Sequence, residues 1–527
     1  MAVPIQQAPR GAAGRGVGAR LWLAIGALTV LFGAFEVSQS GGGLILVAGI
    51  LGIIGGALVV RRPALGIMVY LTTFLFTYPA YLRGVGNFTI NNILGLMLIP
   101  LMLYGLLRDG SGWIFRYRPL HILAVASLAM IISSSFYHPS NEYAQELEQA
   151  KVERSQRAQG PALIATRDAG AKLLTRFAFL AFFVFFIRTP KDLKWVIVMI
   201  IACLVLTYFS VSTEQGIAGW GTGRLRVAEG GGVYAGRNPN KLAYFALFGL
   251  TLLWYARRAI KSPFVWPFWA VATVITFVMI PLTGSRSGLL NLLFFVGIVM
   301  LEGRFNYRKV VGLALVTFFM AIQFGYDISV LDLILPEEIA SRLTHVGLRG
   351  EILEEEGLEA AGSTEGRVRT MQAALRVWSL HPVFGVGIGN FNTERAVTDP
   401  FGTVGPPHDS YLWALSEGGL FALILYLGFF WWVFKKIRGI EWEYQARFGP
   451  VDLGWMVSAM RTVIIGFLFF SFFADMWHHE LFYIIAGMSL ALIRLHELYA
   501  ETGQAPQAFV IGRQLQPVRL PPAPAAA

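Results

Sequence analysis

The sequence predicts an all-α, polytopic membrane protein, and two observations carry that prediction. Of the 527 residues, 55% are hydrophobic and only 14% are charged, with a mean hydropathy of +0.57, whereas about 25% of residues are charged in a soluble domain. Apolar runs of about 20 residues recur along most of the chain, and each can cross a hydrocarbon core about 30 Å thick at 1.5 Å per residue. A single signal peptide would not account for this pattern.

These runs predict about fourteen membrane-spanning helices, at a length of about 20 residues for each span. Eleven spans are expected within residues 21–326 and three within residues 409–497. Their expected positions are 21–38, 41–60, 63–80, 90–107, 119–137, 172–188, 194–211, 240–256, 265–283, 287–301, 309–326, 409–434, 461–478 and 481–497.

The charges between the runs predict how the chain is oriented. If the N-terminal tail, residues 1–20, is cytoplasmic, the expected cytoplasmic loops carry basic residues at 61–62, 108–118, 188–194, 257–261, 304–309 and 435–447. This agreement with the positive-inside rule explains the net charge of +11 and excludes nucleic acid as a partner. The Pro- and Ala-rich end of residues 498–527 predicts a disordered cytoplasmic tail.

Four segments expected on the outer, periplasmic face are longer than turns or rich in polar residues: 138–171, 212–238, 327–408 and the tip "DMWHHE" at 475–480. The stretch "TEGRVRTMQAALRVWSLHP" within 327–408 has apolar residues at helical spacing, so we expect one or two helices lying on the outer face. The single cysteine, Cys203, lies inside an apolar run and excludes a disulfide framework or a cysteine metal site.

The first stretch whose residues could take part in binding or catalysis is "PLTGSRSGLLNLL", which places Arg286 between two apolar runs at the outer surface. An arginine at a helix end can simply extend its side chain toward the interface. Small residues surround Arg286, however, and would let a head group approach. Because guanidinium grips phosphate with a planar fork of donors, phosphate contact is the favoured interpretation.

The second stretch is the loop "GRLRVAEGGGVYAGRNPNKLAYF", with Arg224, Arg226 and Arg237 before a helix start at Asn238 and Asn240. Its glycines permit unusual backbone angles, and a helix N-terminus favours an anion. Either asparagine would also cap the helix. An ordinary flexible loop with a capped helix and an anion-binding loop both remain open here.

The third stretch begins with Arg367, Arg369 and Arg376 on the expected outer-face helix and continues into "HPVFGVGIGNF". Glycines in this spacing follow a helix rather than a strand, which argues against a dinucleotide-binding turn. They predict a tight turn that returns the chain to the membrane.

The same stretch ends in "PPHDSYLWALSEGG", where His408 precedes a long apolar run. A helix N-terminus disfavours the imidazolium, so a histidine there suits a general base. Taken alone, His408 is better explained as a polar residue at a helix start, with Asp409 or Ser410 as the cap. Glu417 would lie on the opposite helix face and about 13 Å deeper, so a structural ion pair is expected for it.

The tip "DMWHHE" offers Asp475, His478, His479 and Glu480, which are residue types that bind divalent cations. Their spacing matches no dedicated metal motif. A short connection between two spans also collects polar residues, and we expect no metal here.

Together these segments resemble the O-antigen ligase superfamily, which includes lipopolysaccharide O-antigen ligases and O-antigen and exopolysaccharide polymerases. The resemblance rests on "GRNPNKLAYF", "TGSRSGLL", "EGRVRTMQAALRVWSLHPVFGVGIGNF" and "PPHDSYLWALSEGGL", within residues 224–425. It implies a membrane enzyme with a GT-C-like fold. Such an enzyme transfers a glycan from undecaprenyl diphosphate to an acceptor hydroxyl, such as lipid A core, at the outer face of the inner membrane.

The resemblance also implies roles for single residues. His408 would deprotonate the acceptor, and Arg286 and Arg367 would bind the diphosphate. The reaction would be inverting and independent of metal, with no cofactor. Arg224, Arg226, Arg237, Asn240, Arg369 and Asp409 are weaker candidates for contact with the diphosphate or glycan. Family members commonly have asparagine where this chain has Asp409, and a carboxylate there would orient the His408 ring or raise its basicity.

Three interpretations of function follow from the sequence. The first is a glycosyltransferase that acts on a lipid-linked saccharide, because three motif residues reach the same face under a topology set by loop charge alone. The second is a transporter or flippase, which usually needs ionisable groups inside several spans, and these are sparse here. A non-catalytic scaffold is the third. Within the enzyme class, ligase and polymerase share a donor and differ in the acceptor.

Overall fold

The computed structural model describes residues 54–75, 90–108, 118–135, 161–215, 239–260, 262–283, 285–302, 354–398, 407–447, 453–477 and 479–502. Every regular element within these ranges is helical, in agreement with the predicted fold class. The labelled helices are α3 (Pro63–Leu75), α4 (Ile90–Arg108), α5 (Arg118–Ser135), α7 (Pro161–Phe186), α8 (Pro190–Gln215), α9 (Pro239–Ala256), α10 (Val265–Leu282), α11 (Arg286–Leu301), α14 (Glu354–Leu380), α15 (Phe391–Thr398), α16 (Ser410–Arg447), α17 (Gly454–Phe470) and α18 (Glu480–Thr502).

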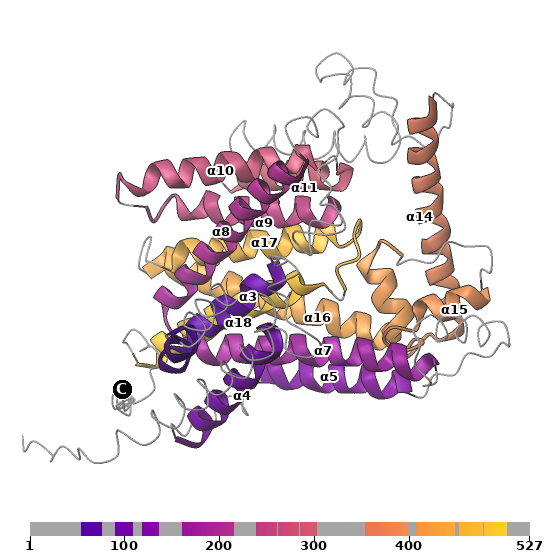
Figure 1. Cartoon of the computed structure of the whole chain (residues 1–527), viewed down its shortest axis with the longest axis horizontal. Coiled ribbons are helices and arrows are strands. Elements are labelled where there is room, and N and C mark those ends of the chain that lie inside the picture. Colours follow the sequence, from indigo (N-terminus) through magenta and orange to yellow (C-terminus); the bar gives the residue numbers. More distant parts are fainter. Residues whose placement is uncertain are drawn as a thin grey trace, which may run out of the picture.

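Most of these helices run side by side, whereas α14 crosses their direction at one end of the bundle (Figure 1). Helix α9 packs against α10, α11 and α17, and α18 packs against α7. Helix α14 packs against α15 and α16 and therefore lies across the end at which α16 begins. This arrangement agrees with the predicted helices on one face of a bundle.

Four helical segments in the described ranges are long and apolar enough to cross a membrane, namely Pro190–Phe209, Val265–Leu282, Ser410–Glu443 and Glu480–Ala500. Shorter apolar helices are Pro63–Thr72, Ile93–Leu107, Ser287–Leu301 and Gly454–Phe470. The predicted spans at 21–38 and 309–326, and most of 41–60, fall outside the described residues, as do the two predicted tails except residues 498–502. The total of about fourteen spans stays a prediction.

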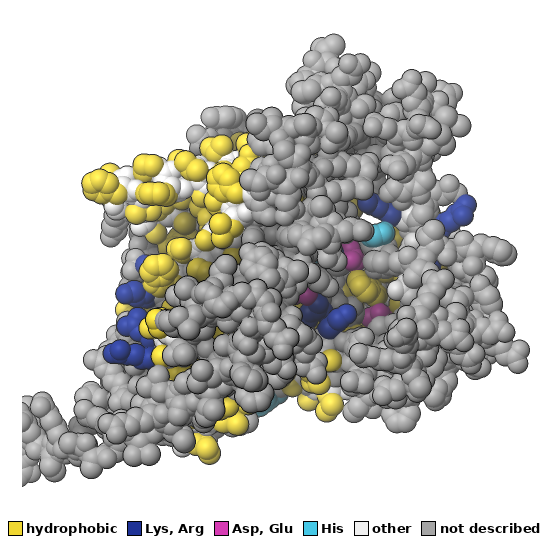
Figure 2. All heavy atoms as spheres, in the orientation of Figure 1, with side chains coloured by type: hydrophobic (Ala, Val, Ile, Leu, Met, Phe, Trp, Pro, Cys, Tyr) yellow, Lys and Arg dark blue, Asp and Glu magenta, His cyan; other side chains and the backbone are white. Residues whose placement is uncertain are grey.

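Basic side chains stack on aromatic rings at the end of the bundle opposite α14. The guanidinium of Arg188 lies 4.6 Å from the Phe185 ring centre, and that of Arg257 lies 3.4 Å from the Trp254 ring centre. The Lys436 ammonium approaches Trp432 at 6.0 Å. Aromatic and basic residues gather in this way at membrane–water interfaces. Lys and Arg side chains also gather at the left edge of Figure 2, away from α14.

The predicted span at 461–478 is corrected to α17, which starts at Gly454 and ends at Phe470. Arg461, the first residue of the expected span, lies inside this helix, and its guanidinium is neutralised within the bundle. It donates to both carboxylate oxygens of Glu441, at 2.8 and 2.7 Å, and pairs with Glu302. Because a buried charge is tolerated when it is paired, the helix continues through Arg461.

Other boundaries also differ from the sequence expectation. Helix α7 starts at Pro161, so part of the expected outer segment 138–171 is helical. Helix α16 continues to Arg447, beyond the expected end at 434. The outer-face segment contains two helices, α14 and α15, as expected, although residues 327–353 and 399–406 lie outside the described part.

Helix α16 is broken at Gly419, whose φ of 64° and ψ of −166° are not helical. The turn after α14 supplies the missing backbone partners. The amides of Val386 and Gly387 donate to the carbonyls of Ser416 and Glu417 at 3.0 and 2.8 Å. In return, the amide of Leu420 donates to the carbonyl of Pro382 at 2.9 Å, and that of Phe421 to Val383 at 3.1 Å. The glycine-rich stretch is therefore a tight turn, as predicted, and it docks on a break in a membrane helix.

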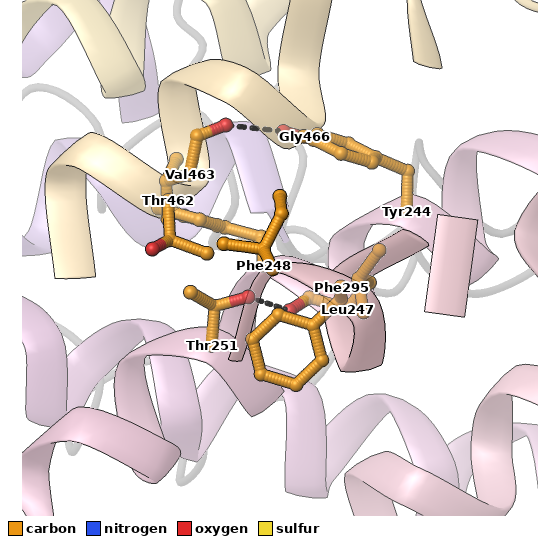
Figure 3. A pocket seen from close by; sticks show the side chains of 9 residues that line it. Tyr244, Leu247, Phe248, Thr251, Phe295, Thr462, Val463 and Gly466 are labelled. Carbon is orange, nitrogen blue, oxygen red and sulfur yellow. Dashed lines mark hydrogen bonds between the residues drawn. The ribbon is translucent and has the colours of Figure 1, made fainter. Parts of the chain in front are cut away.

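Packing between α9, α11 and α17 leaves a cavity of only about 10 Å³ (Figure 3). Tyr244, Phe248, Phe295 and Val463 are among the residues that line it. The Tyr244 hydroxyl donates to the carbonyl of Val463 across it at 3.3 Å. A space of this size holds about one water molecule, so it is a packing gap rather than a ligand site.

Candidate functional site

The N-terminus of α16 is fixed by local hydrogen bonds. Oδ1 of Asp409 accepts from the amides of Tyr411 and Leu412 at 2.8 and 3.0 Å, which makes Asp409 the helix cap. Burial, opposed by these bonds, raises the pKa of Asp409 to about 6. This carboxylate is therefore hydrogen-bonded to backbone amides rather than to the His408 ring.

Ser410 ties the same N-terminus to the connection between α17 and α18. Its amide donates to the carbonyl of Ser471 at 2.8 Å, and its hydroxyl donates to the carbonyl of Ala474 at 2.6 Å. The hydroxyl also accepts from the amide of Met476 at 2.8 Å. Because Ser410 is completely buried, these three bonds hold His408 and the 471–479 connection in a fixed relationship.

His408 has a φ of 54°, and it is the only residue other than glycine with a positive φ in the described ranges. The left-handed conformation costs a non-glycine residue about 1–2 kcal/mol, and such strain concentrates at functional sites. The side chain keeps 36% of its surface accessible, whereas the next two residues, Asp409 and Ser410, are buried. The backbone thus presents an imidazole at the surface of a rigid helix end.

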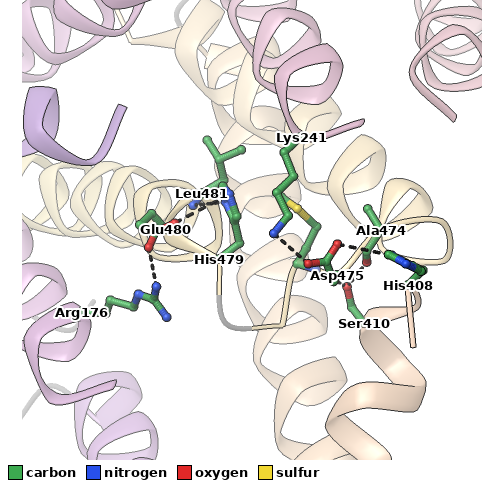
Figure 4. A network of polar contacts seen from close by, with 10 residues as sticks. Arg176, Lys241, His408, Ser410, Ala474, Asp475, His479, Glu480 and Leu481 are labelled. Carbon is green, nitrogen blue, oxygen red and sulfur yellow. Dashed lines mark hydrogen bonds and ion pairs between the residues drawn. The ribbon is translucent and has the colours of Figure 1, made fainter. Parts of the chain in front are cut away.

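The imidazole of His408 faces Asp475 across the two connections (Figure 4). Its Nδ1 atom lies 3.9 Å from Oδ1 of Asp475, whose other oxygen, Oδ2, lies 2.8 Å from Nζ of Lys241. Burial alone would raise the pKa of Asp475, but contacts with His408 and Lys241 outweigh it and hold this pKa below its usual value. Asp475 is therefore an anion held between two basic side chains.

A second charged group adjoins the first. Arg176 of α7 pairs with Glu480, and Nε2 of His479 lies 3.7 Å from Oε2 of Glu480. The Nδ1 atom of His479 accepts from the amide of Leu481 at 3.2 Å, so this nitrogen carries no proton. Burial, with the charge of Lys241, lowers the pKa of His479 to about 4, which leaves the ring neutral at physiological pH. We call Arg176, Lys241, His408, Asp475, His479 and Glu480 the polar network.

Arg367 of α14 lies within electrostatic reach of the polar network. Burial lowers the pKa of Arg367, and the charge of Asp475 opposes this shift, which places the guanidinium within electrostatic reach of that carboxylate. Arg367 is half-buried, whereas Arg369 and Arg376 of the same helix are exposed. Of the three arginines predicted on this helix, Arg367 is thus the least exposed, and its pKa responds to the charge of Asp475.

Two motifs that are separate in the sequence meet beside Lys241. The hydroxyl of Ser285 donates to Oδ1 of Asn240 at 2.7 Å and accepts from the amide of Gly288 at 3.0 Å as the cap of α11. Asn240 precedes Lys241 in α9, and Arg286 is the first residue of α11. Helix α11, whose first residue is Arg286, therefore begins at the same end of the bundle as His408. The side chain of Arg286 lies outside the described part of the structure.

Glu417 is buried, and its Oε1 atom accepts from the amide of Gly389 at 3.1 Å. This bond joins the first part of α16 to the glycine-rich turn. The contact is structural, in line with the role expected for Glu417, although the partner shown is a backbone amide rather than a cation.

Several predicted site residues lie outside the described residues, namely Arg224, Arg226, Arg237, Asn238 and His478. No group of three His, Cys, Asp or Glu side chains suited to a metal ion occurs in the ranges that the structure describes. Within the tip "DMWHHE", Asp475 contacts Lys241 and His408, whereas His479 contacts Glu480.

Sequence reasoning missed Lys241 entirely and considered Asp475 only as a metal ligand. A signal for both was present. Lys241 directly follows Asn240 in "GRNPNKLAYF", and the predicted topology already placed residues 475–480 on the same face as His408. What the sequence did not reveal was that the connection after α17 begins at residue 471, which brings Asp475 beside the start of α16.

A protein-family model described as O-antigen ligase matches residues 271–427. This range includes Arg286, Arg367, His408 and Asp409, and it excludes Lys241 and Asp475. The search of curated proteins finds no match. Together with the apolar helices, the family match indicates a multi-pass membrane protein.

Proposed function

The chain belongs to the O-antigen ligase superfamily through residues 271–427, and from this premise we propose that it is an inner-membrane glycosyltransferase. The proposed reaction moves a glycan from undecaprenyl diphosphate to an acceptor hydroxyl of lipid A core at the periplasmic face. The site would serve the assembly of lipopolysaccharide or another surface polysaccharide, and both chain termini would be cytoplasmic.

The observation that carries the proposal is the contact between His408 and Asp475 at an accessible, strained helix start. With Nδ1 directed at the carboxylate, Nε2 is the ring atom left to accept a proton. A hydroxyl is a weak nucleophile, and a positioned base contributes about 10² to 10⁴ in rate. Asp475 would then stabilise the imidazolium that forms, as a positioning residue.

The reaction is written as a single displacement. His408 takes the proton of the acceptor hydroxyl, and the oxygen bonds to the anomeric carbon of the donor glycan. The bond from that carbon to the diphosphate oxygen breaks, and undecaprenyl diphosphate leaves with the electron pair. Attack opposite the leaving group inverts the anomeric centre.

Negative charge that develops on the diphosphate needs preorganised donors, and arginine supplies these without a metal ion. We assign this role to Arg367, which lies within electrostatic reach of Asp475, and to Arg286, whose helix starts at the same end of the bundle. Arg224, Arg226, Arg237, Asn240, Arg369 and Asp409 remain weaker candidates for contacts with the diphosphate or the glycan. Asp409 is included because it adjoins His408 in the sequence, although its carboxylate already caps α16.

Polymerisation of O-antigen or exopolysaccharide would use the same donor and the same base, with a second lipid-linked glycan as acceptor. The test therefore varies only the acceptor. Purified protein in proteoliposomes receives undecaprenyl-diphosphate glycan with lipid A core or with a second lipid-linked glycan, and products are resolved by mass. Transfer to lipid A core supports the ligase, whereas elongation of the lipid-linked glycan alone would replace it with the polymerase.

The matched control is His381, which directly follows α14, pairs with Glu394 at 3.6 Å and is not one of the six residues named as the polar network. His381→Ala should retain transfer, and His408→Ala should lose it. If folded wild-type protein consumes no donor with either acceptor, the glycosyltransferase assignment is wrong.

A further inference from the structure

The lipid-facing side of α16 is a stripe of exposed apolar residues in the span Ser410–Glu443. Leu420, Ile424, Leu427 and Trp431 are all exposed, and their spacing places them on one side of the helix. Because this is a membrane-spanning segment, the stripe is covered by acyl chains.

Two exposed side chains outside α16 continue this stripe at its outer end. Val383 and Phe384 are each 57% exposed, and they belong to the turn after α14 rather than to a membrane helix. The Phe384 ring lies 5.7 Å from the ring of Phe421, which follows Leu420. The four hydrogen bonds across the α16 break fix the turn at the level of Leu420.

The depth of Leu420 follows from helix geometry. Lys435 and Lys436, the latter stacked on Trp432, mark the opposite interface. A hydrocarbon core about 30 Å thick takes about 20 residues, which counted back from Lys435 reaches residue 415. Leu420 therefore lies about five residues, or roughly 7.5 Å, inside the hydrocarbon, measured from the edge nearer the polar network.

Backbone pairing at the break agrees with this depth. A helix break inside hydrocarbon exposes carbonyls and amides that no water can reach, and it persists only where protein satisfies them. Here the carbonyls of Ser416 and Glu417 and the amides of Leu420 and Phe421 all have partners in the turn. The pairing is reciprocal, as a break in lipid requires.

We propose that the turn at residues 382–384 inserts into the hydrocarbon of the leaflet beside the polar network, where Val383 and Phe384 contact lipid acyl chains. The turn follows directly from α14, so its insertion anchors the helix that carries Arg367. This inference requires only that α16 crosses the membrane and does not depend on the glycosyltransferase assignment.

The test uses nitroxide labels on the full chain in lipid nanodiscs. Cys203 is the only cysteine, so a Cys203→Ala background accepts single labels at Val383→Cys, Phe384→Cys, Ile424→Cys as the lipid reference and Arg376→Cys as the water reference. The ratio of oxygen collisions to nickel-chelate collisions at 383 and 384 should match that at 424 and exceed that at 376, because hydrocarbon excludes the polar chelate. Ratios at 383 and 384 equal to that at 376 would overturn the proposal.

A second measurement keeps the proposal testable if the labelled variants misfold. A photoreactive p-benzoylphenylalanine at residue 384, close in shape to the native Phe384, should form lipid adducts on irradiation, detected by mass as phospholipid attached to that residue. The same amino acid at Arg376 should form none. Photoadducts with lipid at neither residue, in protein that elutes as wild type, would contradict insertion.

Discussion

The Nδ1 atom of His408 lies 3.9 Å from Oδ1 of Asp475, although the two residues belong to different connections, one before α16 and one after α17. The three hydrogen bonds of Ser410 hold these connections together, so the contact does not depend on the two side chains alone. Lys241 on the other carboxylate oxygen keeps Asp475 ionised.

Asp475→Asn should lower kcat by at least about tenfold, because the carboxylate that orients and charge-stabilises His408 is lost. Glycan transfer in proteoliposomes checks this, with kcat and the KM for the donor measured separately, and the KM should change much less than kcat. Asp475→Glu is the control that keeps the charge, and it should retain more activity than Asp475→Asn. Equal losses in the two variants would mean that the charge of this carboxylate is not what supports His408.

Arg367→Gln should raise the KM for the lipid-linked donor by about 10- to 100-fold, since hydrogen bonds to a charged group are worth about 1.5–3 kcal/mol. The KM for the acceptor should change much less. Arg376→Gln is the matched control, because Arg376 is exposed on the same helix and is not one of the residues of the polar network. Equal donor KM values for the two variants would remove Arg367 from the donor site.

Gly385→Ala and Gly419→Ala should each destabilise the protein by about 2 kcal/mol or more. Both residues have a φ of 64°, and an added Cβ would lie 2.4 Å from the backbone of Glu417 at Gly385 and 2.2 Å from the carbonyl oxygen of Val383 at Gly419. Thermal unfolding in detergent measures the loss.

The same helix offers the control for that prediction. Gly428 and Gly439 of α16 have no atom within 4 Å of an added Cβ. Alanine there should be neutral or stabilising by up to about 1 kcal/mol, because alanine is the better helix former. If all four variants unfold alike, the docking of the glycine-rich turn on the α16 break is not what constrains Gly385 and Gly419.

Asp409→Asn should stabilise the protein at neutral pH, because asparagine caps a helix equally well and carries no buried charge. Folding raises the pKa of Asp409 from 3.8 to about 6, so its stabilising contribution is complete below pH 3.8 and is lost as the pH rises through about 6. The variant should therefore gain up to about 3 kcal/mol at pH 7.5 and nothing at pH 3.5.

Asp475→Asn should change the stability in the opposite direction in the same unfolding experiment. The pKa of Asp475 is held below its usual value, so its stabilising contribution is present at neutral pH and is lost only as the pH falls below about 4. The asparagine variant should be less stable than wild type at pH 7.5. Parallel pH dependence of the two variants would mean that the environments of these two carboxylates are wrongly assigned.

The sequence predicted the helical architecture, because hydropathy depends on short stretches of chain. The outer face shared by the site residues, which follows from loop charge, stays a prediction. The sequence did not predict the start of α17, in which the charge of Arg461 is neutralised by Glu441 of α16 and by Glu302, the residue that follows α11. Tertiary pairing of this kind leaves no local pattern.

The candidate base, His408, could be identified from the sequence, whereas its carboxylate partner, Asp475, could not. His408 stands in a motif that resembles a known family, and it precedes an apolar run. Asp409, its neighbour in sequence, was the evident carboxylate partner, but backbone amides occupy it as the helix cap. The contact with Asp475 depends on how two distant connections pack, and only the folded structure brings them together.

The central claim is that His408 removes the proton from the acceptor, and steady-state glycan transfer by His408→Gln tests it most directly. With donor and acceptor both saturating, the account predicts a rate about 10² to 10⁴ below wild type, with the KM for donor unchanged and His381→Gln at the wild-type rate. A folded His408→Gln variant that transfers glycan within about twofold of the wild-type rate would contradict it.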